Sequence, residues 1–387
     1  MYPTVSDLLQ DLFNIHLPMP VQTFGFMLAI SFLFAAWTLS IELKRKEKSG
    51  VIQPITKQIL VGMPATPVEL IMSFLIGFIL GFKAGYIINH YNEFVNDTQG
   101  MLLSSKGNLF FGVMAGAISA WLRYREKEKH KLAEPRYESI TLHPYELVGN
   151  FTMVAAVSGI IGAKIFHNLE NIDDLLHDPL DALISFSGLT MYGGVIFGTI
   201  AVIWYARKNN IAPMQISDAV VPGLMLAYGT GRIGCQLAGD GDWGIVNMHV
   251  KPGWLSWLPD WAWAYNYPHN VINEGLPIPG CTGRHCSMLP DAVYPTPLYE
   301  AITCILLFFF LWGIRKKINI PGMITSIYLL LNGTERFLIE KIRVNNKYHI
   351  AGYAMTQAEI ISFLMIIAGI AGIIYLSRKK NYSSSTL

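Results

Sequence analysis

The chain has 387 residues, of which 52% are hydrophobic and only 14% are charged, whereas about 25% of the residues of a soluble domain are charged. This composition excludes an ordinary soluble protein and indicates a chain that spans a membrane. The net charge of +2 is too small to favour a nucleic-acid partner, so the placement of the charges carries more information than their sum.

Apolar runs, taken in chain order, predict the transmembrane helices. A hydrocarbon core of roughly 30 Å requires about 20 apolar residues per helix. We expect helices over residues 22–42, 68–90, 108–123, 146–167, 184–206, 216–238, 298–314, 322–342 and 358–377. The third run is short and rich in glycine and alanine, so a re-entrant segment is an alternative there. The sequence therefore predicts an all-α, polytopic membrane bundle of about nine helices.

Charges orient this bundle. Residues 1–20 lack the basic start and the small-residue cleavage site of a removable signal peptide, so we expect the first apolar run to remain as a helix. Basic clusters follow every second expected helix, at residues 44–46, 123–131, 207–208, 315–317 and 378–380. Because cytoplasmic loops are enriched in lysine and arginine, the alternation predicts that the N-terminus lies outside and the C-terminus inside.

Two pairs of apolar segments resemble each other. The first pair is GFILGFKAGYIINHYNE (77–93) with FGVMAGAISAWLRYRE (111–126), and the second is SGIIGAKIFHNLEN (158–171) with GGVIFGTIAVIWYARK (193–208). Each pair joins a helix that carries an intramembrane lysine to a glycine-rich helix with a basic end. Two explanations stay open: an inserted or duplicated helix pair near 60–145, or Gly-x-x-x-Gly spacing that only allows close packing.

One extended segment, residues 240–297, lies outside the apolar runs and divides the chain into residues 1–239, this segment, and 298–387. It contains Trp243, Trp254, Trp257, Trp261, Trp263, Tyr265 and Tyr267. Tryptophans favour lipid headgroups, so we expect this extracytoplasmic segment to lie along the membrane surface as a cap. Cys281 and Cys286 are close in sequence on the oxidising side, which predicts a local disulfide.

Charged residues gather near the outer ends of three expected helices. They are Arg232, Glu300, Arg336, Glu340 and Arg343. A charge at mid-bilayer costs roughly 2.5–3.5 kcal/mol on insertion scales, so such side chains usually face a partner or a substrate. Helical spacing allows Glu340 to bridge Arg336 and Arg343. The arginines favour a phosphate-binding site; the alternative is a set of buried ion pairs that fix helix register.

Several segments match, in order, the motifs of one known family. QISDAVVPGLMLAYGTGRIGCQLAGDGDWG (215–244) carries Ser217-Asp218, Gly231-Arg232-x-Gly234 and Trp243-Gly244 in the places of a signature segment. The other matching segments are QTFGFML (22–28), SGLTMYGGVIFG (187–198), YPTPLYE (294–300) and NGTERFLIEKIR (332–343). They resemble the first-helix, glycine-rich, His-Pro-x-x-Leu-Tyr-Glu and Arg-x-x-x-Glu-x-x-Arg motifs of the prolipoprotein diacylglyceryl transferases. The resemblance covers most of the chain except about 60–145 and 245–290.

This resemblance implies a seven-helix enzyme of the bacterial inner membrane with its active site toward the periplasmic face. Such an enzyme moves the diacylglyceryl group of phosphatidylglycerol to the lipobox cysteine thiol of a prolipoprotein, and glycerol phosphate leaves. The displacement requires a deprotonated thiol and a stabilised leaving anion, without a metal or redox cofactor. The segment near 60–145 would supply two further helices. The implied partners are phosphatidylglycerol, prolipoprotein signal peptides and membrane lipids, with no nucleic acid.

The family's functional residues transfer to matching positions of this chain. The resemblance implies that Arg232, Arg336 and Tyr192 are catalytic, with the two arginines on the phosphate. It implies that Arg232 also binds substrate, together with Gly193, Gly194, Asp218, Gly239, Asp240, Glu300, Glu340 and Arg343.

The chain departs from the family pattern at the position of the usual base. Tyr192 stands where the family has a histidine before Gly-Gly, and Phe24 replaces the first-helix tyrosine. A tyrosine with a pKa near 10 assists proton transfer only if neighbouring arginines lower that pKa. Otherwise it hydrogen-bonds the phosphate or packs on the glycines.

Other departures concern the signature and the possible replacement bases. Cys235 replaces the signature asparagine, and the signature's acidic residue is split between Asp240 and Asp242. We expect His143, His167 and His177 to be loop or interfacial residues rather than replacement bases, although His167 lies on the outer side and stays open as a candidate. The predicted function is a membrane transferase, and the alternative is a non-catalytic lipid-binding or lipid-handling paralogue that has lost the base. A transporter is less favoured because the polar residues gather at one face instead of lining a path through the midplane.

Overall fold

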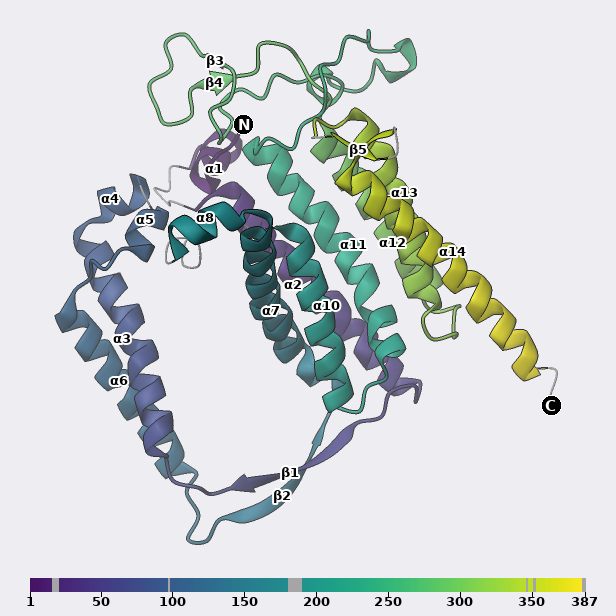
Figure 1. Cartoon of the computed structure of the whole chain (residues 1–387). Helices are drawn as coiled ribbons and strands as arrows, with labels where there is room; N and C mark the ends of the chain where they lie inside the picture. Colours follow the sequence, from purple (N-terminus) through teal and green to yellow (C-terminus); the bar gives the residue numbers. More distant parts are fainter. Residues whose placement is uncertain (16–20, 97, 180–189, 346, 351–352, 385–387) are drawn as a thin grey trace. The chain divides into compact units, whose positions relative to one another are not determined.

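The computed structural model describes residues 1–15, 21–96, 98–179, 190–345, 347–350 and 353–384 (Figure 1). The chain forms two compact units, of which unit 1 contains Met1–Pro3, Thr23–Ile55 and His143–Leu387, and unit 2 contains Thr4–Gln22 and Thr56–Leu142.

Helices make up most of both units. The α-helices of unit 1 are α2 (Thr23–Lys48), α7 (Val148–Glu170), α8 (Ile172–His177), α10 (Met191–Lys208), α11 (Pro213–Ala238), α12 (Thr296–Ile314), α13 (Met323–Ile339) and α14 (Gln357–Ser384). Those of unit 2 are α1 (Val5–Phe13), α3 (Pro67–Asn89), α4 (Tyr91–Asn96), α5 (Thr98–Leu103) and α6 (Leu109–Lys129). Short 3-10 helices are η1 (Pro144–Leu147), η2 (Gly253–Leu255), η3 (Asp260–Ala262) and η4 (Glu340–Ile342).

The expected apolar runs coincide with long helices wherever the structure describes them. Residues 184–189 of the fifth run lie outside the described residues, and helix α10 begins after them at Met191. Among the described residues, five helical segments are long and apolar enough to cross a membrane: Thr23–Lys48, Pro67–Asn89, Pro144–Glu170, Thr296–Ile314 and Gln357–Lys379. The chain is therefore a predominantly helical membrane protein.

The expected all-α class holds for most of the chain, but the structure also contains short strands. Six short strands pair into two-stranded sheets: β1 (Ile55–Val61) with β2 (Arg136–Leu142), β3 (Leu276–Pro277) with β4 (Ser287–Met288), and β5 (Lys347–Ile350) with β6 (Tyr353–Thr356). The last two pairs are antiparallel, with Leu276 opposite Met288 and Tyr348 opposite Met355. These strands lie between the long apolar helices, so a search for apolar runs of helical length does not detect them.

The third apolar run forms one uninterrupted helix. Helix α6 has 21 residues, which corresponds to about 31 Å at 1.5 Å per residue. Its first turn is capped by Asn108, whose side chain accepts a hydrogen bond from the backbone N–H of Phe111. The helix lacks the break that a re-entrant segment requires.

The helix pairs α3–α6 and α7–α10 pack in the same register. A Cβ atom on Gly81 would clash with the Phe111 carbonyl oxygen, and one on Gly162 would lie 2.5 Å from the Gly193 carbonyl oxygen. These contacts occupy corresponding places in the two similar segment pairs of the sequence.

The register match extends along both pairs. A Cβ atom on Gly116 would lie 2.9 Å from the carbonyl oxygen of Phe74, and one on Gly198 would lie 3.6 Å from that of Ala155. Gly116 aligns with Gly198, and Phe74 with Ala155, when the two sequence copies are superposed. The glycines therefore do allow close helix packing, and they do so at equivalent positions in the two pairs.

Helix α11 is the centre of unit 1. It packs against α2, α12 and α13. Glycines face two of these neighbours: a Cβ atom on Gly223 would lie 2.5 Å from the Thr38 hydroxyl, and one on Gly229 would lie 3.2 Å from the Cys304 Cβ atom. Met225 and Cys304 are fully buried between these helices. Because small residues allow close contacts, packing holds α11 where its C-terminal end meets the start of α12.

A buried ion pair joins α2 to α12 at the end of the bundle away from residues 240–297. Arg315 Nε lies 2.9 Å from Glu42 Oε2, and both side chains are almost completely buried. Arg315 also lies over the ring of Trp312. This arginine belongs to a predicted basic loop cluster, but its charge is paired inside the bundle, leaving Lys316 and Lys317 as the loop charges.

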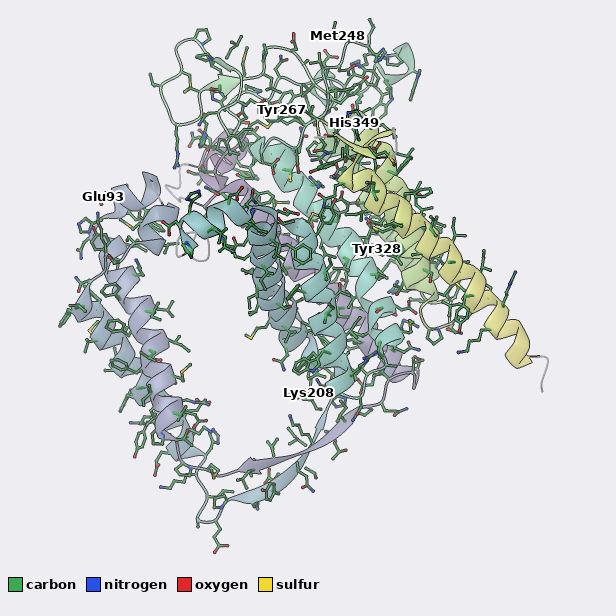
Figure 2. All side chains as sticks on the ribbon, in the orientation of Figure 1. Glu93, Lys208, Met248, Tyr267, Tyr328 and His349 are labelled. Carbon is green, nitrogen blue, oxygen red and sulfur yellow. A yellow bond between two sulfur atoms is a disulfide. The ribbon has the colours of Figure 1, made fainter. Side chains whose placement is uncertain are left out.

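The cap, residues 240–297, has a small core of its own. Trp243, Tyr267, Leu289 and Val293 are buried together. In contrast, Met248 has 85% of its surface exposed, and Figure 2 shows it on the outside of the cap while Tyr267 lies inside. Hydrogen bonds from Lys251 Nζ to the Leu258 carbonyl oxygen and from Asn247 Nδ2 to the Trp263 carbonyl oxygen order the exposed part.

The predicted disulfide between Cys281 and Cys286 is present. In protein isolated without reductant, we expect mass spectrometry after alkylation to find both thiols blocked from the reagent, and to find them labelled only after reduction. Replacing both cysteines by serine should leave transfer activity intact, because the bridge closes a short surface loop. Labelling of both thiols in the unreduced protein would contradict the prediction.

Candidate functional site

Three arginines meet at the end of the bundle that carries the cap. Arg232 lies near the C-terminal end of α11, Arg336 lies in the last turn of α13, and Arg343 directly follows η4. Their side chains are 10%, 21% and 7% exposed. We call these residues, with the carboxylates of Asp242, Glu300 and Glu340, the arginine–carboxylate cluster.

Glu300 is the centre of this cluster. Its fully buried carboxylate lies 2.6 Å from Arg232 Nε, 2.9 Å from Arg343 Nη1 and 3.4 Å from Arg336 Nη1. The Tyr228 hydroxyl donates a further hydrogen bond of 2.7 Å. One carboxylate on the first turns of α12 therefore orients all three guanidinium groups.

Asp242 is the second shared carboxylate. It pairs with Arg232 and with Arg343 from the loop that follows α11. Burial by itself would raise the pKa of Asp242, but the two guanidinium groups outweigh this effect and hold that pKa below its usual value. Asp242 is therefore ionised across the neutral pH range.

Glu340 does not bridge Arg336 and Arg343 as its spacing suggested. It lies 3.1 Å from Arg336 Nη2, and its other oxygen accepts a hydrogen bond of 2.6 Å from Asn345 Nδ2. Arg343 pairs instead with Asp242 and Glu300. The reason is that α13 ends at Ile339 and the chain continues as a 3-10 turn, which has about three residues per turn. This change of pitch moves Arg343 out of line with Arg336.

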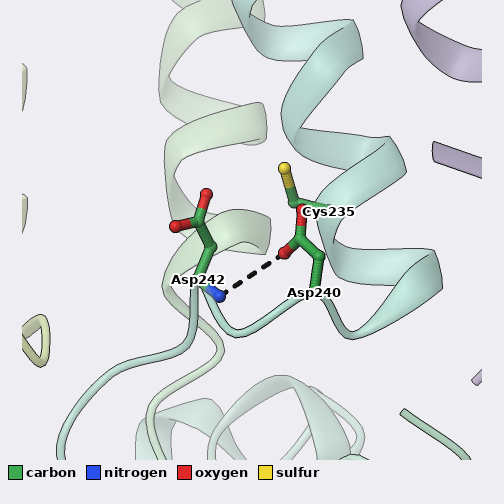
Figure 3. A group of neighbouring side chains, drawn as sticks. All are labelled: Cys235, Asp240 and Asp242. Atoms are coloured by element: carbon green, nitrogen blue, oxygen red, sulfur yellow. Dashed lines mark hydrogen bonds between the residues drawn. The ribbon is translucent and has the colours of Figure 1, made fainter. Parts of the chain in front are cut away.

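Cys235, Asp240 and Asp242 bring their ligand-type atoms within 4.8 Å of one another (Figure 3). Such a group has the composition of a cation site, but Asp242 is already paired with two guanidinium groups. A metal ion there would face these positive charges at close range. The donor set therefore does not fit a metal site.

Comparison with known proteins identifies the family. The sequence profile of the prolipoprotein diacylglyceryl transferases matches residues 129–375, a range that contains every residue of the arginine–carboxylate cluster. The chain belongs to this family.

Individual transferases of the family are similar in sequence to this chain. The chain is 29% identical over 221 residues to the phosphatidylglycerol–prolipoprotein diacylglyceryl transferase of Clostridium tetani, covering 57% of this chain and 77% of the relative. It is 26% identical to the corresponding transferase of Dehalococcoides mccartyi, over 70% of this chain and 90% of the relative. It is 28% identical to that of Corynebacterium diphtheriae, over 66% of this chain and 86% of the relative.

Tyr192, in the place of the transferases' histidine, lies in the first turn of α10 and is half-buried. The charges that act on its hydroxyl include those of Arg336, Glu340 and Arg343. Tyr192 thus lies on the side of the arginine–carboxylate cluster. Among the described residues, its hydroxyl has no hydrogen-bond partner.

Gly193 and Gly194, the other residues of the glycine-rich transferase segment, contact a helix. A Cβ atom on Gly193 would clash with the Gly162 carbonyl oxygen, and one on Gly194 would lie 3.2 Å from that of Gly159. Their first role is therefore close packing of α10 on α7, and they position Tyr192 by that packing.

Asp218 lies away from the cluster. Its carboxylate accepts hydrogen bonds of 2.7 and 2.9 Å from the backbone N–H groups of Gly322 and Thr325, and so caps the start of α13. Asp218 precedes Arg232 by about 21 Å along α11, at 1.5 Å per residue. Its match to the transferase signature reflects a structural role that fixes α13 against α11.

Gly239 ends α11. Its φ of +66° lies in the left-handed region, which glycine adopts at helix C-termini without a steric cost. A Cβ atom there would also lie 3.0 Å from the Cβ atom of Asn270 in the cap. Gly239 therefore turns the chain so that Asp240 and Asp242 follow close to Arg232.

The histidines lie elsewhere. His143 Nδ1 is 2.5 Å from Glu47 Oε1 at the opposite end of α2, and His167 contacts Asn171 near the end of α7. His177 ends the short helix α8. None of these contacts reaches the arginine–carboxylate cluster within the described residues.

Sequence reasoning missed several members of the site. Tyr228 precedes Arg232 by one helical turn, a spacing that could have indicated that both face Glu300. Asp242 was noted only as one half of a split acidic position. Glu335, beside Arg336, is buried and has no hydrogen-bond partner for either carboxylate oxygen among the described residues. Nothing in the local sequence distinguishes it from a surface helix residue.

Proposed function

We propose that this chain transfers the diacylglyceryl group of phosphatidylglycerol to the lipobox cysteine thiol of prolipoproteins, the first step of bacterial lipoprotein maturation. The chain is a transferase of the diacylglyceryl transferase family. The observation that carries the proposal is the convergence of Arg232, Arg336 and Arg343 on one buried carboxylate, at positions within the range matched by the family.

The charges of the cluster are balanced before substrate binds. Its three guanidinium groups face the carboxylates of Asp242, Glu300 and Glu340. An arginine has five N–H donors, and the ion pairs of Arg232 use Nε and Nη1. Its Nη2 group can therefore donate to a phosphate oxygen while Glu300 holds the guanidinium in place. The ion pairs of Arg336 use Nη1 and Nη2, so this arginine donates to the same phosphate through Nε–H and the remaining hydrogens of its Nη groups.

The reaction follows from this arrangement. The lipobox thiolate attacks the glyceryl carbon that bears the phosphate ester, a C–S bond forms, and the C–O bond breaks. The electron pair goes to the phosphate oxygen, and glycerol phosphate leaves with an additional negative charge. Preorganised guanidinium groups stabilise this charge where it develops. Tyr192 and Arg343 complete the donor set, and Glu340 holds Arg336.

We infer that residues 60–145 contain an inserted or duplicated helix pair added to a seven-helix transferase. The matching register of the α3–α6 and α7–α10 pairs supports this inference, because equivalent glycines meet equivalent backbone atoms in both.

For topology, we propose nine membrane-spanning helices in the inner membrane, with the N-terminus and the cap on the periplasmic side. A reporter fused after Lys316 or Arg378 is expected to give a cytoplasmic signal, and one inserted near Gly280 an external signal, because the basic clusters follow alternate helices. Alkaline phosphatase and fluorescent-protein fusions measure the two sides. Inverted readings at these sites would contradict the orientation and the placement of the cluster.

The function is tested by complementation of a transferase-depleted bacterium, together with an assay in membranes that contain labelled phosphatidylglycerol and a lipobox peptide. Growth and label transfer are expected. A non-catalytic lipid-binding protein would accumulate in the membrane and bind the lipid but would support neither result.

A further inference from the structure

The attacking thiol must lose a proton, and the position of the family's histidine is occupied by Tyr192. An acceptor must be ionised at neutral pH, must lie beside the phosphate-binding arginines, and must not already be paired with a cation. These criteria separate Glu300, Asp242 and Asp240, three carboxylates that act on Arg232.

Glu300 and Asp242 do not meet them. Glu300 accepts hydrogen bonds or ion pairs from Tyr228 and from three arginines, and it is fully buried. Asp242 is paired with Arg232 and Arg343. Protonating either carboxylate would release guanidinium groups that bind the phosphate.

Asp240 meets the criteria. It lies two residues before Asp242, just after the turn at Gly239, and is partly exposed. Among the described residues, no lysine, arginine or histidine forms an ion pair with it. Its Oδ1 accepts a long hydrogen bond of 3.4 Å from the Asp242 N–H (Figure 3).

The groups that face Asp240 come from α11 and from the cap. Arg232 and Cys235 lie on α11, Asp242 lies in the same loop, and Tyr267 lies in the cap. The Cys235 Sγ atom and a carboxylate oxygen of Asp240 lie within 4.8 Å of each other, so this carboxylate already lies close to a thiol, the same type of group as the substrate thiol. Burial and the charge of Asp242 raise the pKa of Asp240 above its usual value, which makes it a stronger proton acceptor than an exposed aspartate.

We propose that Asp240 is the general base that takes the proton of the lipobox thiol, an inference that rests on the proposed transferase function. The S–H bond breaks as the proton moves to an Asp240 carboxylate oxygen, and the resulting thiolate attacks the glyceryl carbon. The two aspartates thus divide two tasks: Asp242 orients the arginines and stays ionised, while Asp240 gains and loses a proton in each turnover. Pairs of acids in unlike environments often divide their roles in this way.

This role predicts how the rate of transfer changes with pH. Asp240 must be ionised to accept a proton, so kcat/KM should fall as the pH drops through its raised pKa. This acid limb should disappear in Asp240→Asn. The rate of the variant should instead rise with pH as the thiol, with a pKa near 8.5, ionises without assistance.

The experiment uses the full chain in membranes with labelled phosphatidylglycerol and two lipobox peptides, one with cysteine and one with selenocysteine at the acceptor position. A selenol is ionised at neutral pH and needs no base. Loss of a general base typically costs about 100-fold or more in rate. Asp240→Asn is therefore expected to lose at least that factor with the cysteine peptide, yet to approach the wild-type rate with the selenocysteine peptide. Asp240→Glu should retain part of the cysteine activity.

The matched control is Asp260→Asn, in the cap, whose side chain is 94% exposed; it should behave as wild type with both peptides. Equal slowing of Asp240→Asn with both peptides would overturn the inference, since a structural defect does not distinguish thiol from selenol. Selenium-selective rescue of Tyr192→Phe instead of Asp240→Asn would also overturn it. A wild type that transfers to neither peptide would overturn the proposed function itself.

Discussion

Replacing Arg232 or Arg336 by lysine is expected to lower transferase activity about a hundred- to a thousandfold, the usual cost of removing one preorganised donor to a developing anion. A guanidinium is a planar fork with several donors, whereas an ammonium is a point charge. Arg232 contacts Glu300 and Asp242 at the same time, and a lysine cannot keep both contacts and still reach a phosphate. The measurement is label transfer from phosphatidylglycerol to a lipobox peptide.

The control for this series is Arg136→Lys in β2, whose side chain is 68% exposed and forms an ion pair with Glu138. It should retain wild-type activity. All variants should insert and accumulate, because the positive charge is kept. Near-wild-type rates for both Arg232→Lys and Arg336→Lys would refute the assignment of these arginines to the phosphate.

Glu300→Gln is expected to have a still broader effect, on stability as well as activity. Removing one partner of a buried ion pair typically costs about 3–5 kcal/mol, and Glu300 is the partner of three arginines with no exposed surface of its own. A neutral amide would leave the guanidinium groups with two carboxylates and would not orient them. We expect a lower yield of monodisperse protein in detergent, a lower thermal midpoint and loss of activity.

Glu128→Gln on α6 is the matched control, since its carboxylate is 45% exposed and its ion pair with Lys131 lies on the surface. Surface pairs contribute little, about 0–1 kcal/mol, so this variant should resemble wild type. The thermal midpoint of Glu340→Gln should lie between those of Glu300→Gln and Glu128→Gln, because Glu340 pairs with one arginine only among the described residues. A thermal midpoint of Glu300→Gln equal to that of Glu128→Gln would show that Glu300 is not the centre of the cluster.

The long helices could be located from the sequence because their determinants are local. Runs of about 20 apolar residues and caps such as Asn108 fix where a helix lies regardless of its neighbours. The short strands between them depend on pairing with a distant segment, as β1 does with β2, and local hydropathy carries no information about that pairing.

The residue types of the site were also evident from the sequence. Charged side chains are costly in apolar helices, so Arg232, Glu300 and Arg336 stood out, and the order of the motifs predicted the family that the comparisons confirmed. Their partners were not evident. Glu340 is close to both arginines of its helix in sequence, but Glu300, on another helix, is the residue that joins them.

Tertiary structure alone decided which matching residues lie together. Asp218 and Arg232 share one signature segment, yet about four turns of α11 separate them, and Asp218 caps α13. Asp240 and Asp242 are almost adjacent, yet only Asp242 is paired with the arginines. Sequence determines the chemistry that each position can offer and the element that carries it. The meeting of the ends of α11, α12 and α13 determines which carboxylate neutralises which arginine, because ion pairing depends on distances of a few ångströms between side chains far apart in the chain.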